Sequence, residues 1–169
     1  MVDLLIRMSA NILTIINVIL GTCSIIFTLN DNCKVAGILI LVAVVMDGMD
    51  GRVARKLDSA SEFGKNLDSL CDLVSFGVAP AILLYALYLI KFDILGIAVA
   101  VFFVVCGALR LARFNVSSAT LFFTGVPITI AGGLIVLSSM IITNGIWNIF
   151  IITFLSVMMI STIKIPKLR

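Results

Sequence analysis

Four aspartates recur at the spacing of helical turns in the segment from residue 47 to 72, DGMDGRVARKLDSASEFGKNLDSLCD. Asp47 and Asp50 are three positions apart and Asp68 and Asp72 four apart, so each pair would share one helix face. A carboxylate costs about 2.5–3.5 kcal/mol at the centre of a membrane helix, and four of them would repel one another unless cations lay between them. An all-oxygen cluster suits Mg²⁺, Mn²⁺ or Ca²⁺, and four carboxylates balance two divalent ions. The acids therefore predict a site for divalent cations, with Mg²⁺, Mn²⁺ and Ca²⁺ as candidates.

Small residues accompany the acids on the same faces. Gly51 and Ala54 follow the first pair and Gly64 precedes the second, which leaves room for a large ligand to approach the helix backbone. Arg55 adds a permanent cation suited to a phosphate group. The alternative is that the aspartates only form salt bridges with nearby cations, namely Arg52, Arg55, Lys56 and Lys65. Salt bridges require neither the glycines nor four acids at one depth, so a metal and phosphate site is favoured.

The sequence contains no histidine, so acid–base chemistry must rest on carboxylates, lysine, tyrosine or cysteine, and histidine-ligated zinc is excluded. The four cysteines show no metal-ligand pairing and are interpreted as small apolar residues. Lys65 must stay protonated if it binds a phosphate, and the cysteines have no activating partner in the sequence, so a carboxylate is the expected base.

The elements that must position these residues are membrane helices, because 62% of the chain is hydrophobic and only 12% is charged. The second apolar block, Val35 to Met46, is too short to cross alone and must continue through the first aspartates towards Arg55. The third block must begin near Gly64 and carry the second pair inside. The turn between them falls near Asp58 to Glu62, so two antiparallel helices would bring all four aspartates to similar depth.

Six spans follow from the apolar blocks as a whole. The other spans are Met8 to Asn30, Ile94 to Leu109, and two within the uncharged run 114–163, divided at Asn144-Gly145 and preceded by Gly125-Pro127. We expect an all-α integral membrane protein with one domain over residues 1–169 and a short interfacial segment, Val2 to Arg7. A helix distortion is expected near Pro80.

Ten of the twelve lysines and arginines fall on one side of this arrangement, and only Lys34 and Lys91 fall on the other. The positive-inside rule then places the N-terminus and the aspartates on the cytoplasmic side. The net charge of +3 is too small to indicate a nucleic-acid-binding surface.

The pattern D-x-x-D-G-x-x-A-R followed by G-x-x-x-D-x-x-x-D resembles the signature of the CDP-alcohol phosphatidyltransferase family. It matches without departure at Asp47, Asp50, Gly51, Ala54, Arg55, Gly64, Asp68 and Asp72. The resemblance implies that the aspartates bind two divalent metals, that Asp72 also serves as the base, and that the arginine and small residues contact the cytidine nucleotide.

Further segments resemble the phosphatidylserine synthase branch of that family. Asn11 and Thr14 are similar to its first-helix P-N-x-x-T element, although Ala10 replaces the proline. Three further segments match less specifically, by local similarity alone: Ser75 to Pro80, Arg110 to Asn115 and Phe123 to Pro127. Arg110 and Arg113, with Lys65, are candidates for binding the acceptor or a phosphate, and the two arginines have the alternative of being topology anchors.

The resemblance implies transfer of a phosphatidyl or archaetidyl group from a CDP-lipid to L-serine, with release of CMP. It also implies a homodimer in the lipid bilayer. Small residues at Gly132, Gly133, Ser138 and Ser139 would allow close helix packing. Two alternatives stay open: another acceptor, such as inositol phosphate or glycerol phosphate, and a divalent-cation transporter, since membrane carboxylates also mark ion pathways.

Overall fold

The computed structural model describes residues 2–57, 62–116, 122–161 and 164–166, with side chains for residues 12–48, 62–116 and 125–161. Its helices, in chain order, are α1 (Val2–Leu29), α2 (Cys33–Leu57), α3 (Glu62–Asp72), the π-helix η1 (Leu73–Val78), α4 (Ala79–Leu87), the 3₁₀ helix η2 (Leu89–Phe92), α5 (Asp93–Val116), α6 (Ile128–Ile141) and α7 (Gly145–Ile160). Two strands, β1 (Phe122–Thr124) and β2 (Lys164–Pro166), complete the described elements.

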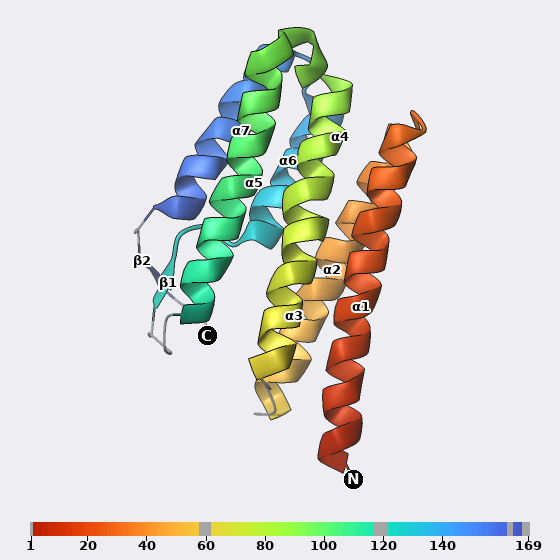
Figure 1. The fold of residues 1–169 in the computed structure, drawn as a ribbon, viewed down its shortest axis with the longest axis vertical. Coiled ribbons are helices and arrows are strands. Elements are labelled where there is room, and N and C mark those ends of the chain that lie inside the picture. Colours follow the sequence, from red (N-terminus) through yellow and green to blue (C-terminus); the bar gives the residue numbers. More distant parts are fainter. Residues whose placement is uncertain (1, 58–61, 117–121, 162–163, 167–169) are drawn as a thin grey trace.

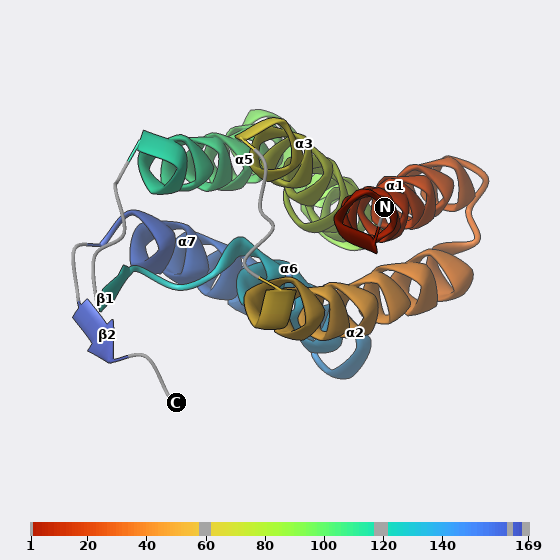
Figure 2. The same ribbon diagram turned by 90° about the horizontal axis from the view of Figure 1, so that it is seen from below.

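The helices are packed as two layers of parallel and antiparallel rods (Figure 1). Seen along the rods, α1, the continuous rod α3–η1–α4, and α5 form one layer, while α2, α6 and α7 form the other (Figure 2). The N-terminal ends of α1, α3 and α6 and the C-terminal ends of α2, α5 and α7 lie at the same end of the bundle, the lower end in Figure 1. Residues near those six helix ends can therefore meet.

Within the described residues, three helical segments are long and apolar enough to cross a membrane: Ile12–Leu29, Glu62–Leu87 and Leu89–Val116. Helices α6 and α7 are shorter apolar helices. The distribution of side chains between the interior and the exterior of the helix bundle also suits a bilayer. Exposed side chains such as Ile19, Leu109 and Phe154 are large and apolar, whereas the buried hydroxyls donate to backbone carbonyls, as Ser24 does to Ala36 at 2.9 Å.

Two features differ from the expectation. Residues Val2 to Arg7 continue α1 without a break, so they are its first turns and not a separate element. The all-α prediction holds for the rods, but β1 and β2 form a short antiparallel pair, with Phe123 opposite Ile165. Each strand is only three residues long. The two meet because β1 precedes α6 and β2 follows α7, and the start of α6 and the end of α7 lie at the same end of the bundle.

The distortion expected near Pro80 is confirmed as the π-helix η1, which begins directly after Asp72. Neighbouring helices approach η1 closely at glycines. A Cβ on Gly21 of α1 would collide with Ser75, and one on Gly132 of α6 would collide with the Phe76 carbonyl oxygen. Gly132 and Gly133 are both buried inside the chain, so the close packing expected for these small residues occurs between helices of one molecule.

Candidate functional site

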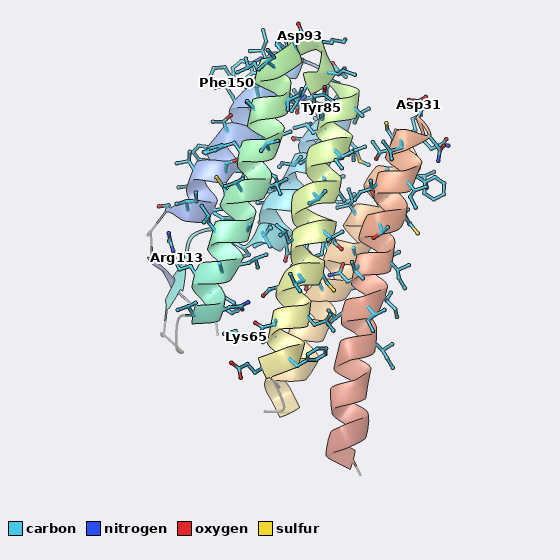
Figure 3. All side chains as sticks on the ribbon, in the orientation of Figure 1. Asp31, Lys65, Tyr85, Asp93, Arg113 and Phe150 are labelled. Atoms are coloured by element: carbon cyan, nitrogen blue, oxygen red, sulfur yellow. The ribbon has the colours of Figure 1, made fainter. Side chains whose placement is uncertain are left out.

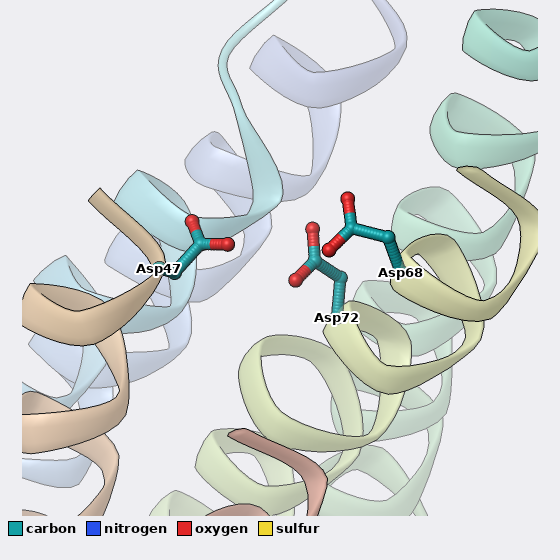
Figure 4. A group of neighbouring side chains, drawn as sticks. All are labelled: Asp47, Asp68 and Asp72. Carbon is teal, nitrogen blue, oxygen red and sulfur yellow. The ribbon is translucent and has the colours of Figure 1, made fainter. Parts of the chain in front are cut away.

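Three of the four aspartates converge between the two layers. Asp47 comes from α2, and Asp68 and Asp72 come from α3, with one carboxylate oxygen of each lying within 4.8 Å of those of the other two. Figure 4 shows the three carboxylates pointing into the same space. Asp72 is buried, Asp47 is half-buried and Asp68 is exposed, so the cluster extends from the interior of the helix bundle to its surface. The side chain of Asp50 lies outside the described residues.

The local sequence explains this convergence. Asp68 and Asp72 are four positions apart, so both project from one face of α3 towards α2, which runs antiparallel to it in the other layer. Helix α2 continues through the Asp47 region to Leu57, as the short apolar block required. Asp72 is the last residue of α3, at the junction with the π-helix. π-Helical segments occur frequently at functional sites.

Helix α6 supplies a hydrogen-bond donor that the sequence analysis missed. The Thr129 hydroxyl, in the first turn of α6, donates to Oδ2 of Asp47 at 3.0 Å. The only sequence signal was the position of this threonine two residues after Pro127 of the Gly125-Val126-Pro127 segment, where a helix was expected to start. Nothing local to α6 indicated that it would meet Asp47, 82 positions earlier.

Helix α1 supplies a second residue that the sequence analysis missed. Asn17 is only 2% exposed, and its amide nitrogen lies 3.5 Å from Oδ1 of Asp72, within reach of a long hydrogen bond. Ser75 of η1 donates to the backbone oxygen of Asn17 at 2.9 Å and so fixes this part of α1 against the π-helix. A signal existed in the sequence, because small or polar residues occupy one stripe of α1 at helical spacing: Asn11, Thr14, Asn17, Gly21, Ser24 and Thr28.

The three cations considered for the acceptor or a phosphate have different surroundings. Arg110 is half-buried on α5, and its charge interacts with the carboxylate of Asp72. Arg113 is exposed and donates to the carbonyl oxygen of Ile160, the last residue of α7, at 3.1 Å. The Lys65 ammonium donates to the backbone oxygens of Phe114 and Asn115 at 3.4 and 3.1 Å, near the end of α5. Figure 3 places Lys65 and Arg113 at the end of the bundle that carries the aspartates.

The residues expected to contact the cytidine nucleotide are only partly described. Thr14 is half-buried one turn before Asn17 on α1, and Gly64 lies one turn before Asp68 on α3. The side chains of Asn11, Ala54 and Arg55 lie outside the described residues, as does Gly51 apart from its place in α2.

The donor set fits a hard divalent cation. The three clustered ligands are carboxylate oxygens, which Mg²⁺, Mn²⁺ and Ca²⁺ prefer. Thr129 and Asn17 each reach one carboxylate from outside the cluster, in the manner of the outer hydrogen bonds that orient metal ligands. The arrangement therefore has both the ligands and the supporting contacts of a cation site.

Comparison with known proteins identifies the family. Residues 7–163 match the sequence profile of the CDP-alcohol phosphatidyltransferases. A CDP-diacylglycerol–serine O-phosphatidyltransferase of Helicobacter pylori is 36% identical over 170 residues, covering 94% of this chain and 72% of the relative. The archaetidylserine synthase of Methanothermobacter thermautotrophicus is 41% identical over 163 residues, covering 93% and 69%.

A third relative, the CDP-diacylglycerol–serine O-phosphatidyltransferase of Bacillus subtilis, is 38% identical over 162 residues, with 93% of this chain and 89% of the relative covered. The apolar helices, the clustered aspartates and the match over nearly all of the sequence agree with one another. The chain belongs to the CDP-alcohol phosphatidyltransferase family, whose members are membrane-embedded enzymes that use divalent cations.

Proposed function

We propose that the chain transfers a phosphatidyl or archaetidyl group from a CDP-lipid to L-serine and releases CMP. The observation that carries the proposal is the meeting of Asp47, Asp68 and Asp72 within 4.8 Å at the end of the bundle where Arg110 also lies. The names of the bacterial and archaeal relatives support serine as the acceptor. Family membership favours this enzyme over the cation transporter.

The reaction needs one bond to form and one to break. The serine hydroxyl oxygen attacks the phosphorus that carries the lipid, and the bond from that phosphorus to the bridging oxygen of the pyrophosphate breaks, so CMP leaves with that oxygen. Asp72 accepts the hydroxyl proton as the attacking oxygen becomes acidic. Asp72 suits this role because it is the most buried of the three carboxylates and Asn17 approaches one of its oxygens, leaving the other for the proton.

We propose that two divalent cations, Mg²⁺ or Mn²⁺, are held by Asp47, Asp50, Asp68 and Asp72. When bound, such cations offset the negative charge of the pyrophosphate and of the departing CMP. Gly51, Ala54, Arg55 and Gly64, with Asn11 and Thr14 on α1, would contact the cytidine nucleotide. Thr14 and Gly64 lie on the helices that carry Asn17 and Asp68, which supports this placement.

We place this end of the bundle on the cytoplasmic side of a six-span protein, with the N-terminus inside. The rods α1, α2, α3–η1–α4, η2–α5, α6 and α7 would be the six spans, although α6 and α7 are short. Lys65 and Arg113 lie at the site end (Figure 3) and Arg110 lies one turn before Arg113 on α5, so the positive-inside rule supports this orientation. A homodimer is also expected, and its surface would not include Gly132 and Gly133, which are buried.

The test is CMP release by the purified protein from CDP-diacylglycerol and from CDP-archaeol, with L-serine, inositol phosphate and glycerol phosphate as acceptors. We expect release that requires serine, stops with EDTA and returns with added Mn²⁺ or Mg²⁺. Turnover with a phosphorylated acceptor in place of serine would refute the assigned acceptor. Full turnover in EDTA would refute the metal requirement.

A further inference from the structure

Two buried polar atoms without hydrogen-bond partners lie on residues that surround Asp72. In the part of the chain whose side chains are described, the buried side-chain atoms without a partner are Oδ1 of Asn17, Nε of Arg110 and Oδ1 of Asn148. Asn148 lies in the first turn of α7, at the end of the bundle opposite the aspartates (Figure 1), and its amide nitrogen donates to the carbonyl oxygens of Ile142 and Asn144. Asn17 and Arg110, in contrast, both interact with Asp72, the proposed base. Buried polar atoms are rarely left unpaired, so these two point to a ligand.

The orientation of the Asn17 amide follows from its neighbour. An amide oxygen facing a carboxylate oxygen would be repelled, so the amide nitrogen must be the group that faces Asp72. The amide oxygen then points away from Asp72 while remaining buried. The position of Asn17 is fixed by the hydrogen bond from Ser75 to its backbone and by the close approach of Gly21 to Ser75. Asn17 therefore presents a fixed acceptor that requires a donor.

Arg110 presents the complementary donor. It continues the buried face of α5 formed by Phe103, Cys106 and Gly107, which turns its side chain towards the interior. Its Nε is buried and without a partner, whereas Arg113, one turn later, is exposed and bonded to the end of α7. A guanidinium whose charge interacts with Asp72 can retain a small carboxylate that the aspartates would otherwise repel.

We propose that Asn17 and Arg110 form the subsite for the two charged groups of the acceptor, an inference that rests on the proposed function. Oδ1 of Asn17 accepts from the acceptor ammonium, the Arg110 guanidinium binds its carboxylate, and its hydroxyl lies at Asp72. L-serine carries its ammonium and carboxylate on one carbon, a single methylene from the hydroxyl, so the three groups can reach three adjacent side chains. A phosphorylated acceptor without an amine would leave the Asn17 oxygen unpaired and add charge beside the aspartates.

The experiment compares kcat/KM for three acceptors: L-serine, ethanolamine, which lacks the carboxylate, and 3-hydroxypropanoate, which lacks the ammonium. In Arg110→Gln, the preference for serine over ethanolamine should fall about 10- to 100-fold, the range for losing a hydrogen bond to a charged group. The preference for serine over 3-hydroxypropanoate should persist. Asn17→Leu introduces an apolar side chain of similar volume. In this variant the preference for serine over 3-hydroxypropanoate should fall, and the preference for serine over ethanolamine should persist.

The ratio of kcat/KM for serine to kcat/KM for each other acceptor separates recognition of the acceptor from the other effects of a variant. Asn17→Leu also removes the contact with Asp72, which should lower turnover with all three acceptors alike and cancel in each ratio. Arg113→Gln is the matched control on the same helix and should leave both ratios within about twofold of the wild type. A wild-type measurement avoids any loss of folding: L-alanine, which has both charged groups, should compete with serine far better than ethylamine or propanoate does.

Three results would overturn the subsite. Ratios unchanged in both variants, in an enzyme that uses serine, would show that the charged groups bind elsewhere. A rise confined to the KM for CDP-lipid in Arg110→Gln would assign Arg110 to the donor phosphates. Equal competition by alanine, ethylamine and propanoate would also refute it. An absence of CMP release with serine in the wild type would instead refute the proposed function, and the subsite with it.

Discussion

The Thr129 hydroxyl donates a hydrogen bond to Oδ2 of Asp47 at 3.0 Å, so the first turn of α6 supports a carboxylate of α2 across 82 positions of sequence. This contact restrains the Asp47 carboxylate, one oxygen of which lies within 4.8 Å of carboxylate oxygens of Asp68 and Asp72. Contacts of this kind fix the direction of a metal ligand, and their loss typically costs 10- to 100-fold in metal affinity or activity.

Thr129→Val removes the hydroxyl and keeps the shape of the side chain. We expect the Mn²⁺ concentration for half-maximal activity to rise about tenfold, because Asp47 loses its restraint. Thr129→Ser retains the hydroxyl and should stay close to the wild type. A metal titration of the three proteins measures this, and an unchanged Mn²⁺ dependence in Thr129→Val would show that the hydrogen bond does not affect metal binding.

Asp72→Asn should reduce kcat by about 10²–10⁴-fold, the range for a positioned general base. Asp72 is buried beside Asn17, whereas Asp68 is exposed at the edge of the cluster. Asp68→Asn is therefore the matched comparison and should lose more CMP and metal affinity. The measurement is kcat beside the affinities for CMP and Mn²⁺ in both variants. If Asp72→Asn lost binding as completely as Asp68→Asn while chemistry in the remaining complex stayed fast, Asp72 would be a ligand alone.

Lys65 joins α3 to the end of α5. Its ammonium donates to the backbone oxygens of Phe114 and Asn115 and lies 5.2 Å from the centre of the Phe114 ring, while Ser69 donates to Oδ1 of Asn115 at 3.2 Å. A cation near a helix C-terminus is favourable because the last carbonyls lack helical partners. Lys65→Met should thus lower the stability of the protein by about 1–2 kcal/mol, measured by thermal unfolding in detergent.

The matched variant for this contact is Ser69→Ala, which disrupts the same joint from the next turn of α3. Its effect should be non-additive with Lys65→Met, because both changes release the end of α5. A large rise in the KM for CDP-lipid in Lys65→Met, without any loss of stability, would instead show that Lys65 binds the substrate phosphates.

Gly132→Ala should destabilise the protein by about 1–3 kcal/mol, because the added Cβ would collide with the backbone of Phe76 in the π-helix and backbone cannot move aside cheaply. Gly133→Ala is the control on the adjacent residue. There the Cβ would lie 3.4 Å from a Val44 methyl group, an ordinary contact. Thermal unfolding of both variants tests the difference, and equal stability of the two would mean that α6 and the π-helix adjust their separation freely.

The sequence by itself determined which residue types form the centre and which helices carry them. The spacings of the aspartates and of the apolar blocks are local properties, so they predicted the positions of α2 and α3 and the convergence of Asp47, Asp68 and Asp72. The shortness of the block before Asp47 required α2 to continue through the acids. These predictions depend only on helix periodicity and on the length needed to cross a membrane.

Only the tertiary structure decided which further residues meet the acids. Asn17 and Thr129 lie on separate helices, far along the sequence from Asp72 and Asp47, and their contacts exist because α1 and α6 pack closely on the π-helix at Gly21 and Gly132. The sequence likewise left Arg110 and Arg113 equivalent at spacing three. The surroundings of α5 separated them, because the groups that a side chain reaches depend on the neighbouring helices and not on its own helix: Arg110 is half-buried with its charge near Asp72, whereas Arg113, one turn nearer the end of α5, is exposed and donates to the carbonyl oxygen of Ile160.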